Sequence, residues 1–354
     1  MDEMDKYEFN KGYYHFAEDL IRFPDAWCYV VWSARTAGKT YSALWYALAN
    51  NIKIAYMKRT NDDVKLICNE NKIGLDASPY YPINRDHNTD VRAKLIDKGI
   101  GGFYIEGETS PISYVLSLNA SKALKGFDLS VCDWFVFDEF IPQPGEIVKR
   151  KEGEMVLSLY MTLRRDREKR GRDPLRLILF ANAESISTPV TNTLEIVDTM
   201  ADMNITGEEF NYDEERGILL HRIKSSCADY ENSGIYKAMK DTAWGRVAFG
   251  GEFANNDFSC VRKMSIKGMR PLIELHYKMK NYYIYQRSDG IYYMCSSRGK
   301  CVRSYDLNRE LEQRNFYRKD GFDLVNRAIR GNMFFQSYSM YDLIANYKRY
   351  FDIT

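Results

Sequence analysis

Residues 31–44 read VWSARTAGKTYSAL and contain the triplet Gly38, Lys39 and Thr40. The triplet matches the end of the phosphate-loop pattern G-x-x-x-x-G-K-[ST]. In such a loop the backbone N–H groups cradle phosphates, the lysine reaches the β- and γ-phosphates, and the hydroxyl binds Mg²⁺. The spacing therefore predicts that Lys39 binds a nucleotide phosphate and that Thr40 is a magnesium ligand, with ATP as the nucleotide.

The loop departs from the pattern at its start. Ser33 occupies the position of the first glycine, and Arg35 stands inside the loop. Both residues, together with Tyr41 directly after the triplet, are predicted to lie against the nucleotide. The match is either a chance one or a variant of the motif, and its surroundings must decide.

A pair of adjacent acids, Asp138 and Glu139, follows the apolar run 134–137 about a hundred residues downstream of the loop. At the end of a strand, Asp138 would hold Mg²⁺ in its outer coordination sphere, and Glu139 would polarise the attacking water as a general base. The other reading is that the two acids begin a solvated loop. An adjacent Asp-Glu pair favours hydrolysis over phosphoryl transfer to a small acceptor.

A third polar residue, Asn182, ends the apolar run LRLILFA at 175–181. An amide at this point can contact the γ-phosphate or the attacking water. The alternative is an asparagine that forms a turn.

These side chains need strands that end at one edge of a sheet. Five apolar runs, separated by helical stretches, read as buried strands and predict a mostly parallel sheet covered by helices. They cover residues 26–32, 52–57, 113–118, 132–138 and 175–181. The first runs into the phosphate loop and then into a helical stretch, which is the context that the motif requires. The predicted fold is α/β, of the P-loop NTPase type (the ASCE branch).

The residue composition of the chain changes after about residue 200. Residues 202–217 are acidic and turn-rich, residues 243–259 are rich in Gly and Asn, and residues 281–297 carry aromatic runs around Ser-Asp-Gly, which predicts a β-hairpin. The last 40 residues have a helical pattern. The predicted domains are an ATPase domain at 1–205, a linker subdomain at 206–254 and a small α+β domain at 255–354.

Composition limits the choice of function. The chain has 354 residues, of which 45% are apolar and 28% charged, as in globular proteins. No apolar run approaches ~18–20 residues, so no membrane partner is expected. Seven cysteines without C-x-x-C spacing read as reduced thiols. Residues 261–354 carry 18 Lys and Arg against 9 Asp and Glu, which suggests a polyanionic partner.

The loop S-A-R-T-A-G-K-T resembles the variant phosphate loop of phage terminase large subunits, with an arginine three places before the glycine. The run SLNASKALKGFDLSVCDWFVFDEF is similar to the Ala-Leu-Arg-Gly segment that precedes the acidic pair in that family, with Lys125 in place of the arginine. The run IAYMKRTNDDV also resembles the family's second strand. The resemblance is specific over about residues 27–190 and general after 240.

Terminases also carry an RNase-H-like nuclease, whose metal site needs several carboxylates from separate strands. Here the matching strand offers Tyr285 and Gln286, and Asp289 falls in the predicted turn. The chain therefore resembles the compact DNA encapsidation ATPases of small tailed phages with double-stranded DNA, whose C-terminal domain is a shortened, nuclease-dead relative. Nuclease activity is not expected.

This resemblance implies a homo-oligomeric ring, usually a pentamer, that drives double-stranded DNA into a procapsid with ATP. It further implies that the protein lies in the host cytoplasm and transiently at the portal vertex, and that it is not part of the mature virion. The partners implied are the portal and, in some relatives, a structural packaging RNA. A neighbouring subunit would supply a cation to the γ-phosphate. Arg164 and Arg165 are the candidates, with Lys125 as an additional contact; a solvated helix face is the other reading of this charge run.

DNA should be contacted through its phosphates, because a packaging motor moves over any sequence. The candidates in the N-terminal half are Lys58, Arg59, Lys65, Lys149, Arg150 and Lys151. Basic residues at 262–270 would meet DNA, a portal or RNA. The tyrosines at 282, 283, 285, 292 and 293 are predicted to belong to the core and the sheet surface in preference to a platform for base stacking.

Three alternatives remain open. A nuclease-competent terminase would cut plasmid DNA, and another P-loop helicase or translocase would show further helicase motifs, of which no clear set is found. A non-enzymatic assembly factor with a vestigial site would keep its function after Lys39→Ala.

Overall fold

The computed structural model describes residues 13–69, 77–124, 126–224 and 232–351. Its contacts divide the chain into two compact units. The first comprises the residues up to Leu194 together with Asp202–Asn255, and the second comprises Glu195–Ala201 and the residues from Asn256 on.

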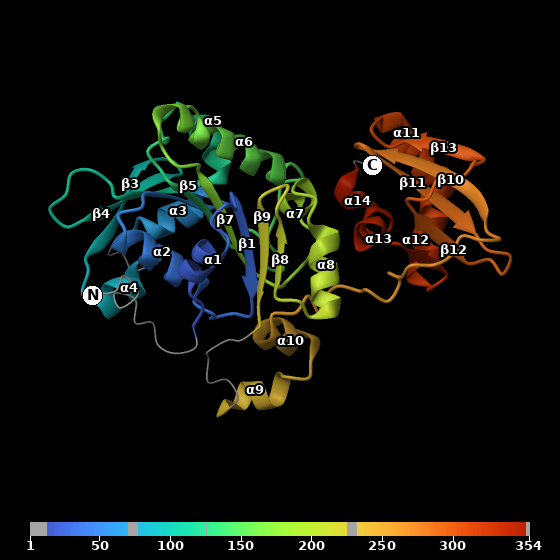
Figure 1. The fold of residues 1–354 in the computed structure, drawn as a ribbon, viewed down its shortest axis with the longest axis horizontal. Coiled ribbons are helices and arrows are strands. Elements are labelled where there is room, and N and C mark those ends of the chain that lie inside the picture. The colour runs from blue at the N-terminus through green and yellow to red at the C-terminus, as the bar shows by residue number, and fades with distance from the viewer. Residues whose placement is uncertain (1–12, 70–76, 125, 225–231, 352–354) are drawn as a thin grey trace. The chain divides into compact units, whose positions relative to one another are not determined.

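The first unit is built on a nine-stranded sheet of order β3-β4-β5-β2-β6-β7-β1-β9-β8 (Figure 1). The six central strands run parallel to one another. They are β5 (Ser113–Ser117), β2 (Ile54–Lys58), β6 (Trp134–Asp138), β7 (Arg176–Asn182), β1 (Cys28–Ser33) and β9 (Ile218–Ile223). The predicted mostly parallel sheet is confirmed, and all five predicted strands belong to it.

Antiparallel strands flank this parallel centre. They are β3 (Val91–Asp97) and β4 (Ile100–Ile105) at one edge and β8 (Phe210–Asp213) at the other. Residues 206–254 were predicted to form a linker subdomain, whereas β9 pairs with β1 inside the sheet. The reason is visible in ILLHRI at 218–223, where all six residues are buried and behave as a central strand.

Successive side chains of a strand face opposite sides of the sheet. On one side, Tyr29 and Val31 of β1 pack with Phe16 of α1 and Leu44 of α2 in the main core. Trp27, directly before β1, contacts Tyr160 of α6, with the two ring centroids 5.0 Å apart. The helices of this unit are α1 (Phe16–Arg22), α2 (Lys39–Ala49), α3 (Asn61–Ile67), α4 (Tyr81–His87), α5 (Ser121–Leu124), α6 (Glu152–Arg164), α7 (Pro189–Thr193), α9 (Gly234–Met239) and α10 (Ala243–Gly250). α8 (Val197–Thr206) begins in the segment that belongs to the second unit.

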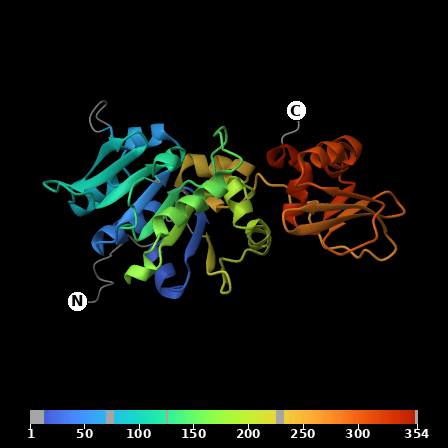
Figure 2. The same cartoon turned by 90° about the horizontal axis from the view of Figure 1, so that it is seen from above.

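The second unit has a five-stranded sheet of order β13-β10-β11-β12-β14, coloured orange to red in Figure 2. The strands are β10 (Arg270–Tyr277), β11 (Lys280–Gln286), β12 (Tyr292–Cys295), β13 (Arg303–Asp306) and β14 (Met333–Phe335). β11 and β12 pair antiparallel, which confirms the predicted hairpin. The helices are α11 (Glu310–Phe316), α12 (Phe322–Ile329), α13 (Tyr338–Ala345) and α14 (Tyr347–Tyr350), with a π-helical turn at Tyr317–Gly321.

The hairpin tyrosines are part of the packing, as predicted. Tyr283, Tyr285 and Tyr293 are buried in a small cluster on one face of the sheet. Tyr282 and Tyr292 pack against the larger core formed with the helices on the other face. Asp289 lies in the turn, where it pairs with Arg287.

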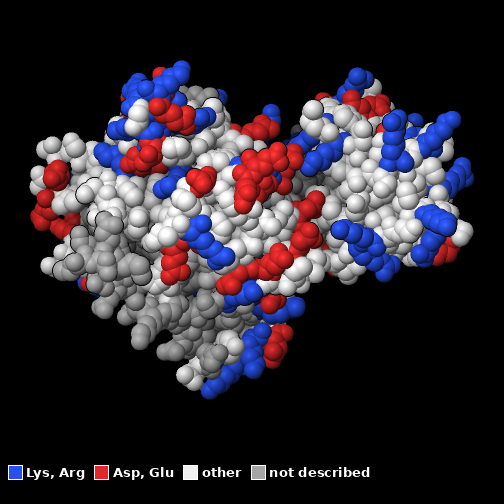
Figure 3. Space-filling view, in the orientation of Figure 1, with Lys and Arg blue, Asp and Glu red and all other residues white. Residues whose placement is uncertain are grey.

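The surface of the second unit carries many Lys and Arg side chains on the face seen in Figure 3. Within the described parts of the chain, no three His, Cys, Asp or Glu side chains come together to hold a metal ion. Neither does any helix in these parts have the length and hydropathy needed to cross a bilayer. Among the described cysteines, Cys28, Cys132, Cys260 and Cys295 are buried, and Cys227 lies outside the described residues.

Candidate functional site

The residues of the predicted phosphate loop lie in the turn between β1 and α2. Gly38 has φ +84°, a conformation that side chains rarely adopt, and a Cβ atom there would lie 3.2 Å from the Tyr13 ring. Thr36 also has a positive φ of 63°. Gly38 directly precedes α2, whose first residues are Lys39 and Thr40. The N–H groups that open this helix are therefore available to an anion at the loop.

Lys39 is buried, with 8% of its surface exposed. Its Nζ donates to Ser33 Oγ at 2.5 Å, to the Ala34 carbonyl at 3.3 Å and to Asn182 Oδ1 at 3.3 Å. Burial lowers the pKa of Lys39 to about 8, although Asp138 and Glu139 act in the opposite direction. The serine that replaces the first glycine thus provides an acceptor for a desolvated ammonium group.

Asp138, at the end of β6, is held from two sides. Thr40 Oγ1 donates to Asp138 Oδ1 at 2.9 Å, and the Tyr56 hydroxyl donates to Oδ2 at 2.7 Å. Burial raises the pKa of Tyr56 well above its ordinary value, and Asp138 adds to the effect. Tyr56 therefore remains a neutral donor that fixes the orientation of the carboxylate.

Glu139 follows β6 with a left-handed backbone, φ +57°. Its carboxylate is 40% exposed and lies 2.9 Å from Lys58 Nζ. The Gln143 amide nitrogen donates to the other carboxylate oxygen at 3.0 Å. A non-glycine residue in this region of φ is uncommon and is found most often at functional sites, where surrounding contacts maintain it.

Arg35 lies beside these groups and joins them through Gln143. Its Nη2 donates to Gln143 Oε1 at 3.3 Å and to Glu184 Oε1 at 3.2 Å. An arginine only donates and a carboxylate only accepts, so Gln143 must direct its oxygen to Arg35 and its nitrogen to Glu139. Gln143 therefore connects the loop arginine with the acidic pair.

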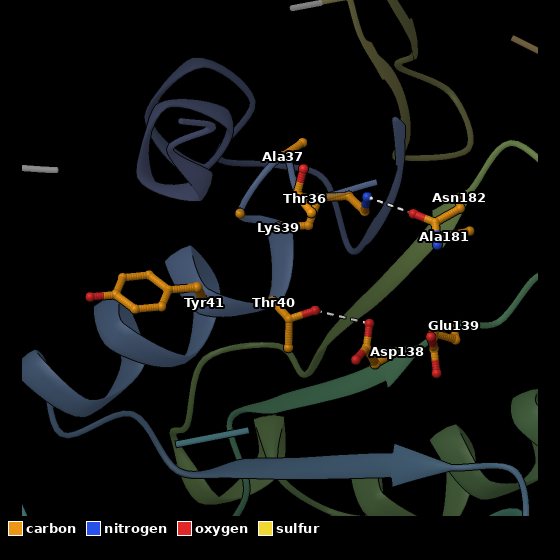
Figure 4. Close-up of a pocket in the computed structure, with 10 residues that line it drawn as sticks. Thr36, Ala37, Lys39, Thr40, Tyr41, Asp138, Glu139, Ala181 and Asn182 are labelled. Carbon is orange, nitrogen blue, oxygen red and sulfur yellow. Dashed lines mark hydrogen bonds between the residues drawn. The ribbon is translucent and has the colours of Figure 1, made fainter. Parts of the chain in front are cut away.

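A cavity of about 210 Å³ opens between the loop and the acidic pair. This volume is below the ~300–1,000 Å³ of sites that enclose whole drug-sized ligands, and it suits a phosphate chain better than a base. In Figure 4, Lys39 points toward Asn182 and Thr40 toward Asp138, while Tyr41 points away from the acids. The lining residues are Thr36, Ala37, Gly38, Lys39, Thr40, Tyr41, Asp138, Glu139, Ala181 and Asn182.

The residues present suit a magnesium ion bound with a nucleotide. A hydroxyl and a carboxylate that lie 2.9 Å apart are the oxygen donors that Mg²⁺ prefers beside phosphate oxygens. Thr40 would be the direct ligand and Asp138 would bind through water. When bound, the ion would neutralise charge on the phosphates.

Arg59 and Lys58, two of the expected DNA contacts, lie beside carboxylates of the first unit. Arg59 is buried, 9% exposed, and binds Glu152 and Glu146. Lys58 pairs with both members of the acidic pair. Both side chains therefore have carboxylate partners within the chain, and their contact with DNA phosphates stays a prediction.

The four other expected DNA contacts are exposed: Lys65 on α3, and Lys149, Arg150 and Lys151 before α6. Lys149 Nζ also donates to Asn119 Oδ1 at 2.5 Å. Their DNA contact stays a prediction.

The two candidate arginine fingers lie at the end of α6, outside the cavity lining. Arg164 makes a bidentate pair with Glu168 at 2.8 and 2.6 Å, and Arg165 lies 3.5 Å from Asp128. Arg165 also has an unusual φ of 36°. Lys125 falls outside the described residues. The role of all three stays a prediction.

Sequence reasoning missed four residues that organise the site: Tyr56, Gln143, Glu152 and Glu184. Tyr56 precedes the end of a strand beside β6, and that position was the only available signal. Gln143 and Glu184 lie in loops without periodicity, so their partners follow only from the fold.

Fold and site together define an α/β protein with a candidate nucleotide-phosphate site. No protein-family model matches the sequence, and no curated protein matches it. Among solved structures, a chain of the Phi-28 gp11 DNA packaging motor aligns with a TM-score of 0.63 at 16% identity, over 97% of this chain and 98% of that one. A chain of the bacteriophage Phi-29 viral genome packaging motor assembly aligns with a TM-score of 0.65 at 16% identity, over 96% and 99%. The chain therefore has the fold of these packaging-motor chains along nearly its whole length.

Proposed function

We propose that this chain is the ATPase subunit of a ring-shaped motor that moves double-stranded viral DNA into a preformed procapsid. Two independent lines support the proposal. One is the shared fold with chains of two phage packaging motors over nearly the whole length. The other is the constellation of loop, lysine and acidic pair, which a fold likeness alone does not require.

The observation that carries most weight is the hydrogen bond of 2.9 Å between Thr40 and Asp138. The two residues are 98 positions apart, and each was assigned to the magnesium site from its own motif. Their contact supports one site for Mg²⁺ and ATP.

Each side chain has a role in hydrolysis. Lys39 binds the β- and γ-phosphates. The negative charge of these phosphates raises the pKa of Lys39, which burial has lowered. Glu139 accepts a proton from the attacking water, which Asn182 and the bound phosphate hold in line. Gln143 and Lys58 fix the Glu139 carboxylate before the water arrives. Arg164 or Arg165 of a neighbouring subunit stabilises charge on the γ-phosphate.

The second unit serves as the contact with polyanions or with the portal. Its excess of 18 basic over 9 acidic residues in 261–354 supports a nucleic-acid partner, either DNA or a structural packaging RNA. The exposed cations Lys65, Lys149, Arg150 and Lys151 would meet DNA phosphates in the first unit. We expect the ring, a pentamer in similar motors, to assemble transiently at the procapsid portal in the host cytoplasm and to be absent from the mature virion.

The test is ATP hydrolysis by the full chain with Mg²⁺, with and without supercoiled plasmid, for the wild type, Lys39→Ala and Glu139→Gln. We expect Glu139→Gln to keep ATP binding and lose at least ~100-fold in turnover, within the range for a general base. Lys98→Met, which changes an exposed lysine in the turn between β3 and β4, is the control for loss of a cation.

The outcomes separate the candidate functions. Turnover that needs Lys39, rises with DNA and leaves the plasmid intact supports a nuclease-free motor. Plasmid cutting would instead indicate a terminase with an active nuclease. Turnover that is unaffected by Lys39→Ala would refute the site.

A further inference from the structure

Arg59 directly follows β2 and is enclosed between the turn after β6 and the start of α6. Only 10% of its side chain is exposed. Its guanidinium lies over the Phe137 ring at 5.5 Å. A buried arginine needs a partner for its charge, and Glu152, the first residue of α6, is itself 2% exposed.

The guanidinium group contacts two carboxylates and two backbone carbonyls. Nε donates to both Glu152 oxygens at 3.3 and 3.1 Å, and Nη1 donates to Glu146 at 2.5 Å. Nη2 donates to the carbonyl of Glu139 at 3.1 Å and to that of Phe140 at 3.0 Å. Arg59 therefore binds the backbone of the proposed general base and makes no contact with its carboxylate.

These carbonyl contacts explain the strained turn. Glu139 has φ +57°, which costs an ordinary residue ~1–2 kcal/mol and persists only where other contacts compensate. The carbonyls of Glu139 and Phe140 both accept a hydrogen bond from Nη2 of Arg59, and these two bonds compensate for the strain at Glu139. The Phe140 N–H also donates to the Phe180 carbonyl at 3.1 Å, which fastens the turn to β7.

We propose that Arg59 is a positioning residue for hydrolysis: it holds the backbone of Glu139 in the left-handed conformation that directs the carboxylate into the cavity. The proposal rests on the proposed function, in which Glu139 is the base. Lysine cannot substitute, because a single ammonium lacks the planar fork that reaches two carboxylate oxygens and two carbonyls at once. Arg59 acts through Glu139 and is not among the residues that line the cavity.

The experiment measures kcat, KM and ATP affinity for full-length wild type and Arg59→Lys, alone and in a Glu139→Gln background. A displacement of about 1 Å at a reacting group can lower turnover ~100-fold, so we expect Arg59→Lys to lose ~10- to 100-fold in kcat. Affinity for a fluorescent ATP analogue should stay within about twofold, because the phosphate loop is untouched. In the Glu139→Gln background, whose slow turnover is followed with radiolabelled ATP, the same change should have no further effect.

Two matched controls accompany it. Glu146→Gln removes the more exposed partner of Arg59 and leaves the carbonyl contacts, so kcat should stay near that of the wild type. Arg92→Lys changes an arginine of β3 that is half exposed and should change nothing. If Arg59→Lys does not fold, Glu152→Gln provides the same test, because it loosens Arg59 and keeps the guanidinium.

The outcomes distinguish this proposal from the proposed function. An unchanged kcat in folded Arg59→Lys overturns the positioning role alone. An equal loss of kcat from Arg59→Lys in the wild-type and Glu139→Gln backgrounds also overturns the positioning role, because a merely structural role acts in both backgrounds. Absence of Lys39-dependent turnover in the wild type overturns the proposed function and this proposal with it.

Discussion

The ammonium group of Lys58 lies 2.9 Å from the carboxylate of Glu139 and 3.5 Å from that of Asp138. β2 and β6 are parallel neighbours with Met57 opposite Phe137, so the next residue of each strand brings cation and acids together. Burial alone would lower the pKa of Lys58, but the two carboxylates outweigh it and leave the pKa above its ordinary value. One cation therefore pairs with two adjacent acids.

Removing this cation should destabilise the protein. We expect Lys58→Met to lower the free energy of unfolding at pH 7 by about 1–3 kcal/mol, less than the ~3–5 kcal/mol of a fully buried pair because Glu139 is 40% exposed. Urea denaturation measures the difference. The exposed Lys65→Met should change it by less than ~0.5 kcal/mol, and an equal effect of both variants would argue against the pairing.

Lys39 should make the stability of the ligand-free protein depend on pH. Its pKa is about 8 in the fold against an ordinary 10.5, so the folded state binds this proton less tightly than the unfolded state. Below pH 8 Lys39 is charged in the folded state, and its burial lowers the free energy of unfolding by the full amount. Between pH 8 and 10.5 this destabilisation decreases as pH rises. Lys39→Met should therefore be more stable than the wild type by ~1–3 kcal/mol at pH 7, with a smaller gain at pH 10.

Denaturant titrations of the wild type and Lys39→Met at the two pH values measure this difference. The contributions of other titrating groups are the same in both proteins and cancel. A wild type that is the more stable protein at pH 7 would show that the burial of Lys39 carries no penalty.

The hydroxyl of Tyr56 should matter for the metal-dependent step. Tyr56→Phe removes one hydrogen bond to Asp138 and leaves the ring packing intact, and a hydrogen bond to a charged group contributes ~1.5–3 kcal/mol. We expect a several-fold rise in the Mg²⁺ concentration at half-maximal turnover and a fall in kcat. A Mg²⁺ titration of the ATPase activity measures both.

Tyr160→Phe is the matched control for that titration. Its hydroxyl bonds the Leu175 carbonyl and makes no contact with the site. A Tyr56→Phe protein with the Mg²⁺ dependence of this control would rule out a role for the hydroxyl.

If Arg164 or Arg165 acts on a neighbouring site, mixed assemblies should recover activity. The pair between Arg164 and Glu168 is at the surface, and such pairs contribute ~0–1 kcal/mol, so Arg164 can leave Glu168 for a phosphate. A mixture of Arg164→Ala with Lys39→Ala subunits contains interfaces with one intact arginine and one intact loop. Packaging or ATPase activity above that of either variant alone is expected; no recovery for either arginine would exclude action between subunits.

The chemistry at the strand ends could be predicted from the sequence. Gly38-Lys39-Thr40, the pair Asp138-Glu139 and Asn182 each follow a continuous apolar run, and the carboxyl ends of parallel strands lie at one edge of a sheet. The alternation of such runs with helical stretches also predicted the sheet itself. The apolar residues Ile218, Leu219 and Leu220 contained part of the same signal for β9, but His221 and Arg222 interrupt the run and the residues before it are acidic.

Only the tertiary structure decided which polar side chains serve each other. Arg59, Lys58 and Tyr56 are 80 or more residues away from their partners at the acidic pair, and their charge and position in the chain suggested DNA contact as readily as an internal role. A cation far from its partner in the chain can be assigned only when the distance between neighbouring strands is known. The phosphate site was thus predictable from local order, whereas the network that holds Glu139 in place depends on strand pairing and on the docking of α6.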